Sequence, residues 1–150
     1  MPSLRLTAPR RDAELIRANR GFYDALWLQA RLIEPQRFNT WPLLSQLAAA
    51  APQRLEVAPG LRPRLPLQGT CFVDLSDAAL HRLQQRGATA VHGMIGALPY
   101  RDASFTLICA LDILEHVRDD GAGRRPAAIG AAASAGVDRV RRFRRPLPAL

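Results

Sequence analysis

The chain has 150 residues, of which 48% are hydrophobic and 23% are charged, and its formal net charge is +8. This length and composition predict one globular domain with an apolar core. The longest apolar run, FTLICALDIL, is about half as long as the ~20 residues that a membrane-spanning helix needs, and the first residues lack the apolar stretch of a secretory signal, so the sequence predicts a cytoplasmic protein.

The positive charge is concentrated near the C-terminus. Residues 1–120 contain 14 arginines against 12 acidic residues, whereas residues 121–150 contain 7 arginines and a single acid, Asp138. All 21 basic residues are arginine, a bias that indicates GC-rich coding DNA more than selection for guanidinium chemistry. The net charge is therefore weak support for binding to nucleic acid.

Helices are predicted before residue 53. Between residues 11 and 33, apolar side chains recur at helical spacing and Gly21 interrupts the pattern, so one or two helices are expected here. A further helix is predicted with Thr40 as its N-cap, Pro42 in its first turn and Pro52 as its end. The apolar stripe predicted for this helix consists of Leu43, Leu44, Leu47, Ala48 and Ala51.

From residue 54, short apolar runs alternate with a helical pattern. Strands are predicted at 54–58, 70–75, 89–93 and 105–111, and the turn-rich segment 59–69 separates the first two. Ser76 is expected to cap a helix that Gly87 ends. This alternation predicts an α/β fold, namely a Rossmann-like doubly wound parallel sheet that is incomplete, with about four strands and N-terminal helices.

The alternating pattern stops near residue 120. The segment 121–150 is rich in arginine, alanine and glycine and has no coherent apolar face, so we expect a disordered basic tail. The predicted organisation is a helical arm (1–52), a partial sheet domain (53–120) and the tail (121–150). A shifted reading frame in GC-rich DNA would give such a composition, which suggests a truncated or frameshifted chain. Its open edge at strand 105–111 is then a predicted site of self-association or partner binding.

Two acids and a glycine stand where an α/β sheet binds a nucleotide cofactor. Glu56 ends the first strand, Gly60 lies in the following turn, and Asp74 ends the second strand 18 positions after Glu56. In such folds the first loop approaches the cofactor and an acid at the end of strand two binds its ribose hydroxyls. Asp74 is open to a second interpretation, as a helix-capping acid, and Glu56 to a similar structural one.

The segment GALPYRDASFTLICALDILEHVRDD carries the most specific signal in the chain. It resembles the stretch of class I S-adenosylmethionine-dependent methyltransferases that typically reads LPFPDGSFDLV followed by VLEHV. Residues 98–100, 104–105 and 114–117 carry the match. With RLEVAPG and FVDLSDAAL in the family's order, the resemblance covers approximately residues 54–120 and is similar to the small-molecule, type 11-like group.

The resemblance implies S-adenosylmethionine as cofactor and a small-molecule methyl acceptor. It implies that Glu56, Ala58 and Gly60 line the methionine part of the cofactor, that Asp74 binds the ribose, that Leu75 flanks the adenine and that Ile95 meets the base edge. Asp112 and His116 are the catalytic candidates that the resemblance implies. Asp112 would lie near the transferred methyl group, and His116 would face the substrate. His116 has the alternative of a surface or helix-start residue.

The first loop departs from the family pattern of an acid followed by Gly-x-Gly-x-Gly. Here Ala58, Gly60 and Arg62 stand at the three glycine positions, and Met94 and Thr106 replace acids that the family commonly has. A side chain restricts the close approach of backbone to ligand that glycine permits. These departures predict a weakened cofactor site and leave open whether this chain is an active enzyme.

Other chemistries find less support in the residues. Cys71 and Cys109 lie within predicted strands and are expected to be buried free thiols. His81 and His92 have no partners at metal-ligand spacing, so no metal site is predicted. An alternative function is a non-catalytic module that binds nucleic acid or a protein partner through the arginine-rich tail. A dehydrogenase would need an intact G-x-G-x-x-G, which APGLRP does not supply.

Overall fold

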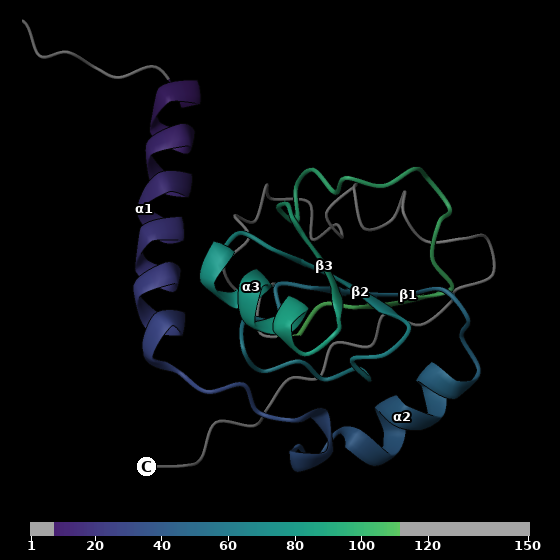
Figure 1. Ribbon diagram of the computed structural model, residues 1–150. Coiled ribbons are helices and arrows are strands. Elements are labelled where there is room, and N and C mark those ends of the chain that lie inside the picture. The colour runs from purple at the N-terminus through teal and green to yellow at the C-terminus, as the bar shows by residue number, and fades with distance from the viewer. Residues whose placement is uncertain (1–7, 112–150) are drawn as a thin grey trace, which may run out of the picture.

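A computed structural model describes residues 8–111 of the chain (Figure 1). The helices in this part are α1 (Ala8–Gln29), the short 3-10 helix η1 (Pro35–Arg37), α2 (Trp41–Ala49) and α3 (Asp77–Gln85). The strands are β1 (Arg54–Val57), β2 (Thr70–Asp74), β3 (Thr89–His92) and β4 (Leu107–Cys109). Of the helices in residues 8–111, none has both the length and the apolar character required to span a bilayer.

The four strands form one parallel sheet in the order β3-β2-β1-β4. The chain builds outward from β1 to β2 and β3, then crosses back to place β4 on the other side of β1. This reversal creates a topological switch point between β1 and β4, beside which α/β sheets bind their ligands at the carboxyl ends of the strands. The predicted fold class, an incomplete Rossmann-like sheet with N-terminal helices, is confirmed.

Side chains alternate between two buried layers, as the period of a strand requires. One face of the sheet presents Leu55, Val57, Val73 and Ile108, which pack with Phe105, and Ile95, Leu98 and Tyr100 contact this cluster from the loop before β4. On the opposite face Phe72 packs against α3, and Cys109 packs against α2. The sheet is therefore covered on both sides, which explains the nearly continuous apolar strands.

Local signals predicted α3 correctly. The hydroxyl of Ser76 accepts a hydrogen bond from the backbone N–H of Ala79 at 3.2 Å, and Gly87 follows the helix with a φ of 77°. Both features are short-range and are encoded within one turn of chain. Figure 1 shows α3 lying beside α1 and over the sheet.

The N-terminal helices differ in detail from their prediction. Of the one or two helices expected between residues 11 and 33, the structure has one, because α1 continues through Gly21 and a glycine in a helix costs only about 1 kcal/mol relative to alanine. In α2, Thr40 occupies the N-cap position but makes no capping hydrogen bond. Leu43 and Leu47 are 39% and 42% exposed, so the buried stripe is narrower than predicted and consists of Leu44, Ala48 and Ala51.

Arg54, at the start of β1, ties α2 to the sheet. Its guanidinium donates to the carbonyls of Ala48 and Ala51 at 3.0 Å, to the carbonyl of Gln68 at 2.8 Å and to the hydroxyl of Thr70 at 3.1 Å. Carbonyls at a helix C-terminus lack partners within the helix, and a cation there is also favoured by the helix dipole. The planar fork of arginine reaches all four acceptors at once.

We predict that Arg54→Lys lowers the free energy of unfolding by roughly 2 kcal/mol, because an ammonium cannot reach four separated acceptors and leaves part-buried carbonyls without donors. Chemical denaturation followed by circular dichroism measures this difference. Arg86→Lys, at an exposed arginine after α3, is the matched control and should change stability by less than about 0.5 kcal/mol. Equal stability of Arg54→Lys and the wild type would contradict this role for Arg54.

Candidate functional site

The connection between β1 and β2, residues 58–69, contains no helix. Parallel strands are usually joined through a helix that satisfies its own backbone groups, so a loop in this place needs other partners. Glu56 supplies them. Its carboxylate is 2% exposed and accepts hydrogen bonds from the backbone N–H of Arg64 at 2.9 and 3.0 Å and of Leu65 at 2.9 Å. Through these buried hydrogen bonds, Glu56 of β1 fixes the second half of the loop to the sheet.

The first part of this loop keeps a glycine-like shape. Ala58 has a φ of 53° and Gly60 a φ of 54°, both in the left-handed region that disfavours a Cβ. The backbone N–H of Ala58 donates to the carbonyl of Val73 at 2.7 Å, which fixes the turn to β2. Arg62, at the third glycine position of the family, is exposed and places its guanidinium 5.6 Å from the ring centre of Phe38.

Asp74 joins the loop to the end of β2. One carboxylate oxygen accepts a hydrogen bond from the backbone N–H of Gly60 at 2.8 Å, and the other accepts one from Ser76 at 2.9 Å. Burial raises the pKa of Asp74 above 3.8, against the backbone hydrogen bonds of Ser76, Gly60 and Leu75, which lower it, while the nearby charge of Asp24 raises it further. Asp74 therefore caps backbone donors, as its structural interpretation predicts, and it also lies beside the first loop.

The remaining predicted residues divide into two groups. Leu75 follows Asp74 and is half-buried, and Ile95 and Ala58 both pack against the same apolar cluster around Leu55 and Val57. Ala58, Gly60, Asp74, Leu75 and Ile95 are thus gathered around the carboxyl ends of the strands, whereas the Glu56 carboxylate is turned into the crossover. The catalytic candidates Asp112 and His116, and the predicted tail, lie outside the described residues.

Helix α1 contributes residues to this region that the sequence did not indicate. Asp24 accepts a hydrogen bond from the hydroxyl of Ser76 at 2.5 Å and one from the backbone N–H of Ala78 at 3.2 Å, and Arg20 pairs with Asp77. The indole of Trp27 lies directly on Gly60, where a Cβ would collide with it. Arg20, Asp24 and Trp27 share one face of α1 by helical spacing, which is the only sequence signal for them.

The hydrogen bonds to Asp24 affect its ionisation. Burial alone would raise the pKa of Asp24, but the hydrogen bonds from Ser76 and Ala78, together with the charge of Arg20, bring it below 3.8. Asp24 is therefore a carboxylate at neutral pH and stands at the N-terminus of α3, where negative charge is favoured. The N-terminal end of α3 thus has a carboxylate partner from α1.

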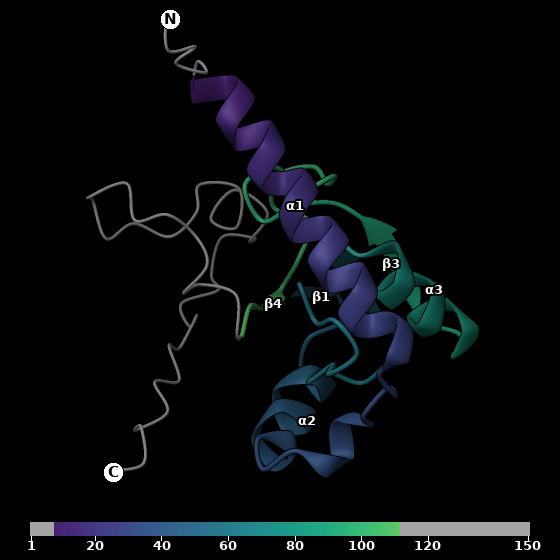
Figure 2. The same ribbon diagram turned by 90° about the vertical axis from the view of Figure 1, so that its left-hand side faces the viewer.

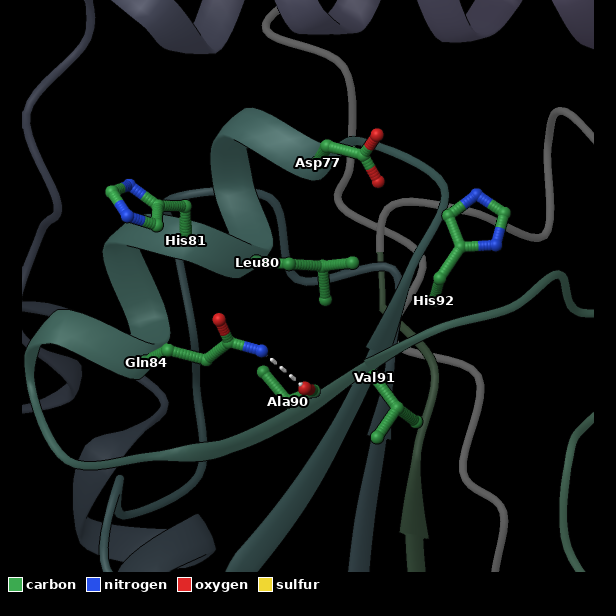
Figure 3. A pocket seen from close by; sticks show the side chains of 7 residues that line it. All are labelled: Asp77, Leu80, His81, Gln84, Ala90, Val91 and His92. Atoms are coloured by element: carbon green, nitrogen blue, oxygen red, sulfur yellow. Dashed lines mark hydrogen bonds between the residues drawn. The ribbon is translucent and has the colours of Figure 1, made fainter.

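A hollow of about 510 Å³ lies elsewhere, between α3 and the edge strand β3 (Figure 3). Gln84 reaches across it from α3 to the carbonyl of Ala90 at 2.8 Å. Within residues 8–111 no group of three or more histidine, cysteine or acidic side chains is arranged to hold a metal ion. Because β2 separates this hollow from β1, it does not belong to the switch point. The side chains that line it are Asp77, Leu80, His81, Gln84, Ala90, Val91 and His92.

We predict that Ala58→Gly raises the free energy of unfolding by roughly 0.5–1 kcal/mol, because relief of the left-handed strain at residue 58 exceeds the greater chain entropy of glycine in the unfolded state. Denaturant titration tests this. Ala79→Gly is the matched control with opposite sign, since Ala79 is helical and buried and should lose at least ~1 kcal/mol. Destabilisation by both substitutions would contradict the strain at Ala58.

We also predict that the carboxyl carbon resonance of Asp74 titrates with a midpoint above 3.8, measured by NMR against pH. A raised pKa means that the folded state holds the proton more tightly than the unfolded state. The contribution of Asp74 to stability is then fully present below pH 3.8 and is lost as the pH rises through its raised pKa. A midpoint at or below 3.8 would show that the hydrogen bonds outweigh burial.

Residues 59–127 match the family model described as a methyltransferase domain, and no curated protein matches the chain. The match includes Gly60, Asp74, Leu75, Ile95, Asp112 and His116, and it begins after β1. Together with the parallel β3-β2-β1-β4 sheet, this match to slightly less than half of the chain is consistent with a class I methyltransferase domain.

Proposed function

We propose that the chain binds S-adenosylmethionine at the carboxyl ends of β1 and β2 and belongs to the methyltransferases that act on small molecules. The observation that carries this proposal is the hydrogen bond between the Gly60 N–H and the Asp74 carboxylate. It brings the first loop and the acid of strand two together at the edge of the sheet where an α/β fold binds a nucleotide.

The residues at this edge fit such a cofactor in two respects. The loop retains left-handed backbone at Ala58 and Gly60, so it has the shape of a glycine loop although only one glycine remains there. The carboxylate of Asp74 accepts backbone hydrogen bonds from Gly60, Ser76 and Leu75, and a carboxylate has about four acceptor positions in all, so acceptor capacity remains for a ribose hydroxyl. Leu75 and Ile95 supply apolar surface on either side.

The role proposed for each residue follows from the chemistry of the cofactor. S-adenosylmethionine supplies a methyl group that is already activated on a sulfonium, so the protein contributes mainly by positioning donor and acceptor. In this proposal Asp74 binds the ribose, the backbone from Ala58 to Gly60 follows the methionine part, and Leu75 and Ile95 enclose the adenine. Asp112 and His116, within the matched family segment, are proposed to face the methyl acceptor.

The proposal of a small-molecule acceptor rests on the family resemblance of the LPYRDASF and LEHV segments. Transfer of a labelled methyl group from S-adenosylmethionine tests it, with small-molecule and macromolecular fractions of a cell extract as alternative acceptors. Label confined to the protein or nucleic-acid fraction would contradict a small-molecule acceptor.

Isothermal titration with S-adenosylhomocysteine tests cofactor binding. We expect saturable binding by the wild type and at least a tenfold loss of affinity in Asp74→Asn, because a hydrogen bond to a charged group contributes about 1.5–3 kcal/mol. Asp102→Asn, at an exposed acid in the loop before β4, is the matched control and should bind as the wild type does. Circular dichroism shows that each variant is folded. Absence of binding by folded wild type, or unchanged affinity in Asp74→Asn, would contradict the proposal.

A further inference from the structure

Helix α1 covers the region that the proposed cofactor would occupy. Trp27 rests on Gly60, a loop position where the backbone carries no side chain. Asp74, the last residue of β2, is only 7% exposed to solvent. The loop glycine is therefore covered by Trp27 of α1, and the proposed ribose acceptor beside it is also buried.

Within residues 8–111, polar contacts join the second half of α1 to α3 and to the turn before it. They are the hydrogen bonds from Ser76 and Ala78 to Asp24, the pair of Arg20 with Asp77, and a bond of 3.3 Å from Arg82 to the carbonyl of Leu28. The side chains of Arg20 and Asp77 are 43% and 59% exposed, and exposed ion pairs of this kind contribute little to stability. The apolar contact of Trp27 adds to this set without joining α1 to the sheet core.

Among the described residues 8–111, no hydrogen bond or ion pair joins the far side of α1 to another element. Leu15, Phe22 and Leu26 lie along it and are 52%, 65% and 46% exposed. Figure 2 shows α1 crossing in front of the sheet, with its N-terminal half running beyond α3. The attachment of α1 thus depends on its second half, from Arg20 onward.

From this arrangement we propose that α1 is a lid over the cofactor site, held closed by Asp24 and plugged by Trp27. The inference rests on the proposed function and adds its regulation: the ligand must displace the indole from Gly60 before it reaches the loop and the Asp74 carboxylate. We call Asp24 the latch, because it accepts the hydrogen bonds from the Ser76 hydroxyl and the Ala78 N–H that join α1 to the start of α3.

The lid makes the apparent affinity depend on how much of the protein is open, since the apparent Kd equals the intrinsic Kd divided by the open fraction. A variant with a weakened latch should therefore bind more tightly, which is the opposite of what loss of a ligand contact produces. Asp24→Ala removes both latch hydrogen bonds. Glu14→Ala, at an exposed acid on the same helix, is the matched control.

The experiment uses the full chain with Trp41→Phe, so that Trp27 is the sole source of indole emission. Acrylamide quenching measures the accessibility of Trp27, and calorimetry measures binding of S-adenosylhomocysteine. We expect Asp24→Ala to increase quenching and to bind about tenfold more tightly, and ligand to increase quenching of Trp27 in the latch-intact protein. Trp27→Leu, which shortens the plug and keeps it apolar, should also bind more tightly.

The outcomes separate this inference from the proposed function. Binding that is unchanged or weaker in Asp24→Ala and Trp27→Leu would overturn the lid and make α1 a supporting wall of the site. Failure of every folded variant to bind S-adenosylhomocysteine, with Trp27 more accessible in Asp24→Ala, would overturn the cofactor assignment and with it the lid over that cofactor. Quenching that does not differ between Asp24→Ala and Glu14→Ala would show that Asp24 is not a latch.

Discussion

The architecture depends on one buried carboxylate. Two parallel strands that follow each other in the chain are joined by a crossover that ordinarily contains a helix. The crossover from β1 to β2 contains none. Glu56 accepts backbone hydrogen bonds from Arg64 and Leu65 and so replaces part of what helical hydrogen bonding would supply. With the far end of the loop held in this way, Leu61 and Leu65 are fully buried and cover the sheet. The near end, at Gly60, is then brought against Asp74.

The candidate site at the ends of β1 and β2 is held together mainly by backbone N–H groups that donate to two carboxylates. Asp74 receives N–H groups from the first loop and from the start of α3, and Asp24 receives further donors from the same helix. The carboxylates of Asp74 and Asp24 thus both accept hydrogen bonds from the residues at the start of α3, and the charge of Asp24 contributes to the raised pKa of Asp74. Movement of α1 changes the electrostatic environment of Asp74 as well as its exposure.

Sequence patterns predicted the parts of the fold that short-range chemistry determines. Apolar runs located all four strands, and Ser76 and Gly87 marked α3, because caps and strand burial are encoded within a few residues. The contact of Trp27 with Gly60 joins residues far apart in the chain, and no local pattern specifies it. The sequence left open one or two helices around Gly21, and one formed because neighbouring helix formers outweigh one glycine. Leu43 and Leu47 were misassigned because helical periodicity does not give the width of the buried face.

Gly21 has a further effect on how α1 behaves as a helix. A Cβ at residue 21 would meet no neighbouring atom within 4 Å, so this glycine serves no close packing and only weakens the helix in its middle. Of the anchors, Arg20 lies directly before this point, and Asp24 and Trp27 lie beyond it. An isolated helix of a dozen residues is marginal in water. Amide hydrogens before Gly21 should therefore exchange with solvent by local fraying, while those near Trp27 exchange only when the helix leaves the sheet, so that one helix reports two separate opening events.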